Sequence, residues 1–428
     1  MNKPLCAVYA PYETYSGYGS RSRDVIKALI ELKKDEWEIK LIPCAWGNTP
    51  RNFIEDNPEW EFLNEYKMEG MQLPKQPDYW CQITIPSEFN NVGKFSFGIT
   101  AGIESTVAPV NWVEGCQRMD LVLGSSQHTI DVLKSSKFQK IDERTKQPLG
   151  NIEWTKEGKV LLEGVRTDVY KPTKSNFNLD GIEESFAYLF TGQWLNGNLG
   201  EDRKNVGLLI KAFFETFKNK TKRPALILKT SSGGSSYMDR DRILAQIKAI
   251  KETVKAYKLP NIYLIHGDFT DEQMNDIYNH SKIKAMISLT KGEGFGRPLL
   301  EFSLTGKPVI TTNWSGHIDF LKPEYSTLLP GELKNIHESA ANQWLLKESK
   351  WFNIDYGAVG NVLVDCFKNY KNYQQKSIKQ ANYSKENFSW EKMKEKMGEY
   401  LNEFPTFAQP MELKLPKLNK LPKLEKVK

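Results

Sequence analysis

Short apolar runs alternate with longer amphipathic stretches along most of the chain. In the first part of the chain, the apolar runs predict buried strands at 5–10, 38–44, 79–86, 95–100 and 120–125. Helical periodicity begins near Ser20 and occurs again at 128–136. Strands and helices that alternate in this way are typical of an α/β fold with a mostly parallel sheet.

The same alternation starts again further along the chain. Strands are predicted at 186–192, 224–230, 261–267, 283–290 and 307–313, and helices at 205–219, 239–257 and 271–281. Thr270 is a suitable N-cap for the last of these helices, and we expect helices to fill most of 333–403. Two such domains in tandem predict a ligand in the cleft between them, at the carboxyl ends of the strands.

A polar segment at 137–159 interrupts the first domain and predicts an exposed loop or hairpin insertion. A strand, a turn and a proline follow at 159–172, where we place the domain junction. The prolines at 416 and 422 rule out a continuous helix near the end of the chain. We therefore predict a first domain at 1–171, a second domain at 172–387 and a disordered, lysine- and proline-rich tail at 406–428.

Composition and charge narrow the possible functions. The sequence has no apolar run long enough to span a bilayer and no signal peptide at its start, which favours a cytoplasmic protein. Five widely spaced cysteines and five histidines predict reduced thiols and no metal site. Residues 411–428 hold six lysines and two glutamates, so they carry +4 of the formal charge of +6. The nearly neutral remainder argues against broad nucleic-acid binding, and the tail either contacts an acidic surface or is simply solvated.

The stretch GEGFGRPLLEF, residues 292–302, combines several features of an anion site. Its three glycines suit positive φ angles and a close approach of the backbone to a ligand. Pro298 suits a first helical turn, whose free N–H groups attract phosphate. Glu301 lies about one turn inside that helix, where a carboxylate can accept hydrogen bonds from two ribose hydroxyls. Glu293 precedes the helix, near the expected phosphates.

This stretch resembles the E-x7-E motif of glycosyltransferase family 4 (GT4), whose retaining enzymes have the GT-B fold. Further segments resemble family segments in the same order: SGYGSR at 16–21, EGVRTDVYKP at 163–172, HGDFTDEQMNDIYNHSKI at 266–283, LTGKPVITTNWSGHIDFL at 304–321 and FSWEKMKEKMGEY at 388–400. The resemblance covers roughly residues 5–404. It implies two tandem Rossmann-like domains, and a helix at 388–405 that crosses back to the first domain.

The resemblance also implies roles for individual residues. Glu301 would bind the ribose of a nucleoside diphosphate sugar, and Glu293 would hold the sugar and the distal phosphate. Lys204, with Arg203 beside it, would neutralise the diphosphate as negative charge grows there; the alternative is a solvated charge pair at a helix start. Further donor contacts are implied at Gly294, Phe295, Gly296, Gly17, Gly19, Gly192, Gln193, Gly267 and Gly316. For Gly17 and Gly19, a simple tight turn is the alternative.

Three departures from the family pattern affect the predicted site. Gln193 stands where the family often has an arginine, so one phosphate-binding cation is missing and Arg203 is the candidate substitute. No counterpart of the family's first-domain histidine can be placed. Glu104 lies near its expected position, either as a catalytic-site carboxylate that binds a sugar hydroxyl or orients the acceptor, or as an ordinary loop residue. Glu163 replaces an asparagine, a change that we interpret as structural.

Rival functions fit the sequence less well. A dinucleotide-binding GxGxxG motif would need glycine at Ser22. A glycoside hydrolase needs two carboxylates facing each other across a bond, whereas Glu293 and Glu301 share one wall of a cleft. We predict a retaining, metal-independent glycosyltransferase with a nucleoside diphosphate sugar as donor and no cofactor. The acceptor is open: a glycan, lipid, protein, small molecule or modified nucleic-acid base. A non-catalytic scaffold, or a nucleic-acid-associated protein acting through the tail, is the alternative.

Overall fold

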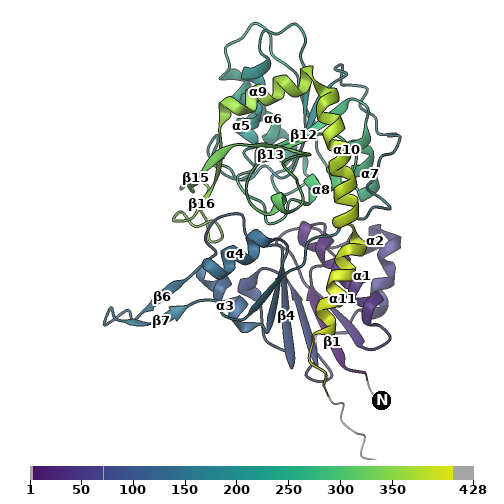
Figure 1. Ribbon diagram of the computed structural model, residues 1–428, viewed down its shortest axis with the longest axis vertical. Coiled ribbons are helices and arrows are strands. Elements are labelled where there is room, and N and C mark those ends of the chain that lie inside the picture. Colours follow the sequence, from purple (N-terminus) through teal and green to yellow (C-terminus); the bar gives the residue numbers. More distant parts are fainter. Residues whose placement is uncertain (1–2, 71, 408–428) are drawn as a thin grey trace, which may run out of the picture.

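Residues 3–70 and 72–407 are described by the computed structural model, which contains two α/β domains stacked one above the other (Figure 1). The sheet of the first domain is parallel, with the strand order β2-β1-β3-β4-β5-β8. Its strands are β1 Leu5–Ala10, β2 Glu38–Pro43, β3 Tyr79–Ile83, β4 Phe95–Thr100, β5 Leu121–Gly124 and β8 Glu157–Val160. The predicted strands of this half are confirmed.

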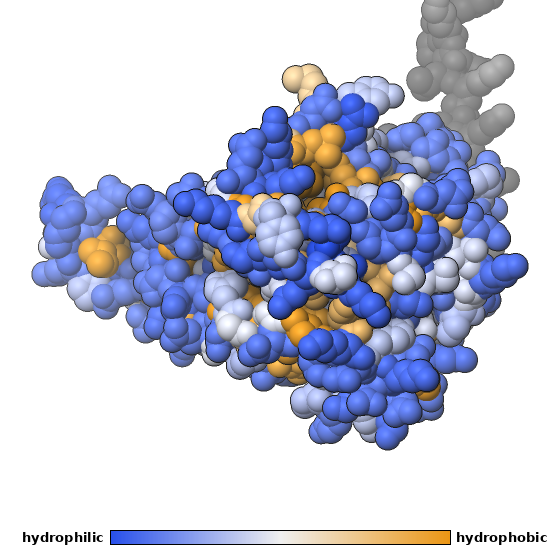
Figure 2. Space-filling model, turned by 90° about the horizontal axis from the view of Figure 1, so that it is seen from above, coloured by the Kyte–Doolittle hydropathy of each residue, from blue (hydrophilic) through white to orange (hydrophobic). Residues whose placement is uncertain are grey.

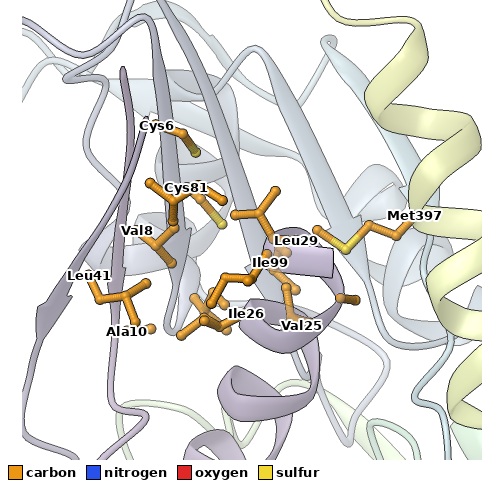
Figure 3. Close-up of a cluster of buried hydrophobic side chains, with 14 of the residues drawn as sticks. Cys6, Val8, Ala10, Val25, Ile26, Leu29, Leu41, Cys81, Ile99 and Met397 are labelled. Carbon is orange, nitrogen blue, oxygen red and sulfur yellow. The ribbon is translucent and has the colours of Figure 1, made fainter. Parts of the chain in front are cut away.

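Helices cover both faces of this sheet. They are α1 Gly17–Lys33, α2 Phe53–Asp56, α3 Val110–Arg118 and α4 Gln127–Ser135. Ser16 is the N-cap of α1, and its hydroxyl accepts a hydrogen bond from the amide of Gly19. Figure 3 shows α1 placing Val25, Ile26 and Leu29 against apolar strand residues, so this helix is anchored in the core.

A two-stranded hairpin, β6 Phe138–Ile141 and β7 Pro148–Ile152, projects from the side of the first domain (Figure 1). It confirms the hairpin alternative predicted for 137–159. Figure 2 shows this arm covered mainly by hydrophilic residues. Only Ile141 and Leu149 are large apolar residues that are highly exposed on it, at 51% and 59%. The hairpin therefore adds little to the core.

The sheet of the second domain is also parallel, with the strand order β11-β10-β9-β12-β13-β14. Its strands are β9 Ala187–Thr191, β10 Ala225–Lys229, β11 Ile262–Ile265, β12 Ile283–Ser288, β13 Val309–Thr312 and β14 Thr327–Leu329. Four helices connect them: α5 Val206–Phe217, α6 Tyr237–Glu252, α7 Asp271–Asn279 and α8 Arg297–Ser303. Thr270 caps α7 as predicted, and Gln273 completes a capping box.

The prediction that helices fill most of 333–403 is confirmed, but two strands there were not predicted. An antiparallel pair, β15 Gly331–Asn335 and β16 Lys350–Ile354, precedes the helices. In β16 the neighbours Trp351 and Phe352 are buried in two different apolar clusters. Successive strand residues point to opposite faces, so a strand can place these two side chains in clusters on its opposite sides. The helices α9 Tyr356–Lys368, α10 Tyr370–Asn387 and α11 Trp390–Asn402 follow.

The last two helices connect the domains. The α10 helix packs on α8 of the second domain, whereas α11 packs on α1 of the first (Figure 1). Trp390, Met393 and Met397 of α11 belong to the first domain's core, and Trp390 Nε1 donates to the Asp24 carbonyl oxygen over 3.1 Å. The expected crossing helix is therefore present, although the exact domain boundaries stay predictions.

Other predictions concern the chain as a whole. The five cysteines are buried and form no disulfide. No helix in the described part of the chain is both long and apolar enough to cross a membrane. Most of the predicted tail, residues 408–428, lies outside the described residues.

Candidate active site between the two domains

The GEGFGRPLLEF loop after β12 lies directly against the first domain. A methyl group added at Gly292 would lie 2.0 Å from the carbonyl oxygen of Glu104, and one added at Gly294 would lie 2.1 Å from that of Ala101. Gly316 is similarly close to the second domain's own loop, since a methyl group there would lie 2.1 Å from the Gly294 carbonyl oxygen. Residues with a side chain at these positions would therefore force the two domains and their loops apart.

Two serines extend this contact between the domains. The hydroxyls of Ser125 and Ser126, which follow β5, donate to the Gly294 carbonyl oxygen over 3.2 and 2.6 Å. Ser126 is also the N-cap of α4. The carboxyl end of the first sheet is thus connected through the glycine loop to the carboxyl end of the second, and the domains are closed on each other at this point.

Four charged residues that were predicted as catalytic lie together in this contact. Lys204 Nζ is 2.5 Å from Glu293 Oε1, and Arg203 Nη1 is 3.4 Å from Glu293 Oε2. Arg203 Nη2 also lies 3.5 Å from Glu104 Oε1 of the first domain. The Arg203 and Lys204 side chains are only 14% and 13% exposed, so they are not a solvated charge pair. Both precede α5, as predicted.

The charges of this cluster shift one another's ionisation. Burial alone would raise the pKa of Glu293, but Lys204 and Arg203 outweigh it and lower this pKa to about 2. Burial lowers the pKa of Lys204, against the opposing attraction of Glu293. Two cations and two carboxylates give a cluster with no net charge. An incoming anion would therefore have to replace a carboxylate as the partner of the cations.

Glu301 lies in a second charged cluster on α8. Its Oε1 accepts from Arg297 Nε over 2.9 Å, and its Oε2 accepts from the Tyr278 hydroxyl over 3.4 Å. Arg297 also pairs with Asp24 of α1 at 2.6 Å and with Glu163 at 3.8 Å. Arg297 thus contacts three carboxylates, and Arg21 is a second cation near Asp24 and Glu163. Burial raises the pKa of Glu301 to about 7, although Arg297 opposes the change.

The glycines of the loop differ from the prediction. Of the three, only Gly296 has a positive φ, 95°, and it is the N-cap of α8. Gly292 and Gly294 have ordinary φ angles. Glycine is needed at both positions because the backbone of the first domain leaves no room for a side chain. The Phe295 side chain is buried against Phe320, with ring centroids 5.0 Å apart, so only its backbone is available to a ligand.

The remaining predicted donor contacts surround this centre. Gly192 has a φ of 156°, and a methyl group there would lie 3.6 Å from Lys204 Cε; Gln193 beside it is exposed. Gly267, with a φ of 143°, follows β11.

The glycines at the start of α1 are placed differently. Gly17 is exposed, whereas Gly19 packs on Thr14, and its amide already donates to Ser16. The Gly19 amide is therefore not free for phosphate, and contacts of the other glycines with a donor stay predictions.

Sequence reasoning missed several residues of these clusters. Arg297 had a usable signal, because it stands four residues before Glu301 on a helix, where opposite charges pair. Asp24 and Tyr278 gave none, since only the fold brings them to Arg297 and Glu301. No histidine was predicted here, yet the ring of His128 on α4 meets Trp314 edge-on at 4.7 Å. Among the described residues, no three His, Cys, Asp or Glu side chains are grouped as metal ligands.

Comparisons with known proteins agree with this architecture. Residues 197–349 match the family model "Glycosyl transferases group 1". No curated protein sequence matches the chain.

Solved structures match nearly the whole chain. A glycosyltransferase from Rickettsia africae has a TM-score of 0.60 at 16% identity, with 94% of this chain and 99% of that chain covered. Anabaena HepE, in complex with UDP and glucose, has a TM-score of 0.60 at 13% identity, with 94% and 100% covered. Sucrose-phosphate synthase from Thermosynechococcus elongatus has a TM-score of 0.57 at 12% identity, with 94% and 98% covered. The chain thus has the GT-B fold of these glycosyltransferases, and its residues 197–349 carry the glycosyl transferases group 1 match.

Proposed function

We propose that this chain is a retaining, metal-independent glycosyltransferase of family 4 that moves a sugar from a nucleoside diphosphate sugar to an acceptor hydroxyl. The observation that carries the proposal is the buried cluster of Lys204, Arg203 and Glu293. All three residues lie within the range that matches the glycosyl transferases group 1 model. HepE of the same fold binds UDP and glucose. A trehalose-6-phosphate synthase of this fold has been studied for glycosyl transfer with retention, at a TM-score of 0.56 and 11% identity.

The two cations would stabilise the leaving group. When the bond between the anomeric carbon and the diphosphate breaks, the electron pair stays on the phosphate oxygen. Lys204 Nζ, which now pairs with Glu293 at 2.5 Å, can turn to that oxygen together with Arg203. Charged donors fixed in a water-poor site stabilise such a developing charge strongly. Glu293, released from Lys204, then becomes free to accept a hydrogen bond from a sugar hydroxyl.

Glu301 would hold the ribose. Each of its oxygens accepts one hydrogen bond at present, from Arg297 and from Tyr278. A carboxylate oxygen has room for a second hydrogen bond, so both ribose hydroxyls can donate without displacing these partners. Arg297 and Tyr278 therefore orient the carboxylate and do not need to leave it.

The configuration at the anomeric carbon is retained if the acceptor hydroxyl attacks from the side that the diphosphate leaves. The new bond joins the acceptor oxygen to the anomeric carbon, and the acceptor proton passes to the departing phosphate. Glu104, near Arg203 at 3.5 Å, is the first-domain carboxylate placed to orient that acceptor. Lys204 and Arg203 take the part that a divalent cation plays elsewhere, so no metal is needed for the leaving group.

A thermal-shift experiment tests the donor site. Wild type, Glu301→Ala and the exposed control Glu324→Ala are titrated with UDP-, GDP-, ADP- and TDP-sugars in the presence of EDTA. Ligands that bind only the folded state raise its melting temperature. We expect one nucleotide class to stabilise wild type and Glu324→Ala but not Glu301→Ala. If no nucleotide sugar stabilised the wild type, a non-catalytic scaffold would become the better interpretation.

A further inference from the structure

A polar pair outside both charged clusters ends two neighbouring strands of the second sheet. Lys229 is the last residue of β10 and Thr191 the last of β9, and the two are paired in register. Side chains alternate along a strand, so Lys229 lies on the same face as Ile227, and Thr191 on the same face as Leu189. That face packs against α7 and α8, which carry Tyr278 and Glu301.

Neither member of this pair is satisfied within the described chain. Thr191 Oγ1 is buried and makes no hydrogen bond, although the Tyr278 hydroxyl is near it. Lys229 Nζ has no hydrogen bond or ion pair with a described residue and lies 5.4 Å from the centre of the Phe269 ring. Burial lowers its pKa, and the charge of nearby Asp268 opposes this change without forming an ion pair.

Lysines that are largely buried in this domain have partners. Lys204 pairs with Glu293, and Lys307 Nζ donates to the carbonyl oxygens of Tyr278 and His280 over 2.7 and 2.9 Å. Lys229 is only partly buried and its ammonium is not among the buried atoms, yet no acceptor of the described chain binds it. An unpartnered cation next to an unpartnered hydroxyl, at the carboxyl edge of a parallel sheet, therefore indicates a ligand with acceptor atoms.

The order of the strands says which part of a nucleotide reaches this pair. The cation Lys204 lies beside Gly192, at the ends of β9 and β12. From there, the direction toward β13 is closed, because Gly316 touches the Gly294 carbonyl. On the other side of β9 the sheet continues with β10 and β11, on the face where α7 and α8 carry Tyr278 and Glu301. A nucleotide whose phosphates meet Lys204 and whose ribose meets Glu301 then places its base near Lys229 and Phe269.

We propose that Lys229, with Thr191, forms the base end of the donor site, and that Lys229 Nζ donates to the exocyclic carbonyl oxygen of the base. This inference rests on the proposed function and adds a specificity to it. An ammonium only donates hydrogen bonds. Uracil, thymine and guanine carry an oxygen at the position where cytosine and adenine carry an amino group. Lys229 would therefore select keto bases, and the Phe269 ring would give the base an apolar neighbour.

Two matched nucleotide pairs test this selection. UDP and CDP differ at position 4 of the pyrimidine, and IDP and ADP differ chiefly at position 6 of the purine. Their dissociation constants are measured by calorimetry for wild type, Lys229→Met and the exposed control Lys248→Met. We expect wild type to prefer the keto member of the pair it binds by about tenfold, as for a hydrogen bond to a charged group. Lys229→Met should bind that member about tenfold more weakly and lose the preference, whereas Lys248→Met should behave like wild type.

Inorganic pyrophosphate separates the base from the phosphates. Its affinity should be the same in wild type and Lys229→Met, which also shows that the variant is folded. If Lys229→Met lost as much affinity for pyrophosphate as for UDP or IDP, Lys229 would contact phosphate and the inference would be overturned. An equal loss of affinity for the keto and the amino nucleotides would have the same meaning. Unchanged UDP and IDP affinities in Lys229→Met would also overturn the inference. If wild type bound none of these nucleotides, the proposed function itself would fail, together with this inference.

Discussion

The two glutamates of the GEGFGRPLLEF loop stand eight residues apart and have opposite surroundings. Glu293 faces two cations, Lys204 and Arg203, which lower its pKa to about 2 although burial would raise it. Glu301 pairs with one cation, Arg297, which also contacts Asp24 and Glu163, and burial raises the pKa of Glu301 to about 7. Both side chains are 9% exposed, so depth does not explain the difference. The balance of neighbouring charges does.

This difference assigns different chemistry to the two positions. A carboxylate that faces two cations can be replaced by a diphosphate, because the cations gain an equivalent partner. A carboxylate with too few cations gains from neutral donors such as hydroxyls, which stabilise its charge without bringing another. The same residue type in one loop therefore suits the phosphate end of a donor at Glu293 and the ribose end at Glu301.

The largest effect is expected when the cation-rich site loses Lys204. We predict that Lys204→Ala lowers kcat about 100-fold, or about 2.7 kcal/mol, because the leaving phosphate loses its main cation. The donor KM should change much less, since Arg203 still binds the ground state. Steady-state kinetics with the donor found in the thermal-shift panel measure both values.

Lys248→Ala, on the exposed face of α6, is the matched control and should keep wild-type kinetics. A Lys204→Ala enzyme with wild-type kcat would show that the Lys204–Glu293 pair only supports the fold. In that case the two glutamates would differ in their neighbouring charges but not in function.

A smaller effect is expected when a methyl group at Gly294, in the loop between the two glutamates, keeps the two domains from closing. The methyl group of Gly294→Ala would lie 2.1 Å from the Ala101 carbonyl oxygen. We predict a loss of kcat of about thirtyfold, since closure orders the site, while each domain stays folded. Gly181→Ala is the control, because nothing lies within 4 Å of a methyl group there. Equal kcat in both variants would show that the closed contact is not needed for turnover.

Most of the fold could be predicted from the sequence, because the strands bury continuous apolar runs. In LCAVYA and PALILKT, for example, both faces of the sheet are covered, so hydrophobicity alone marks the strand. The 331–335 strand could not be found in this way. All five of its residues are exposed, and it exists because β16 pairs with it.

The site could be predicted only where its residues are neighbours in the chain. Glu293, Glu301 and the pair Arg203–Lys204 stand in short motifs, so their types and spacing carry a signal. Asp24 reaches Arg297 across 273 positions, and Thr191 meets Lys229 through strand register. Such contacts depend on topology, and no local pattern encodes them. The same holds for Gly294. The carbonyl oxygen of Ala101 leaves no room for a side chain there, whereas the backbone conformation of the loop does not require a glycine.

The raised pKa of Glu301 makes a pH dependence the next test of the comparison. The ionised carboxylate accepts ribose hydroxyls better, so donor affinity should rise by up to about tenfold between about pH 6 and 8. In the free protein the sign is opposite: because the folded state holds this proton more tightly than the unfolded state, stability falls as pH rises from about 4.5 to about 7. Glu301→Gln should remove both slopes.

Calorimetry with an intact nucleotide sugar measures the affinity, because its diphosphate has no proton to lose in this range. Urea unfolding at each pH measures the stability. Slopes of equal size in wild type and Glu301→Gln would place the titrating group elsewhere and would remove the contrast with Glu293.

The smallest effect should come from Glu163, which contacts Arg297 and raises the pKa of Glu301 by repulsion. Glu163→Gln should lower that pKa and move the midpoint of the donor-affinity profile to lower pH. At pH 7 about half of the wild-type carboxyl is ionised, so the variant can gain at most about twofold in affinity there. Above pH 8, where both proteins are ionised, the two affinities should converge. A variant that instead bound the donor more weakly at every pH would show that Glu163 positions Arg297, and that geometry rather than charge balance separates the two glutamates.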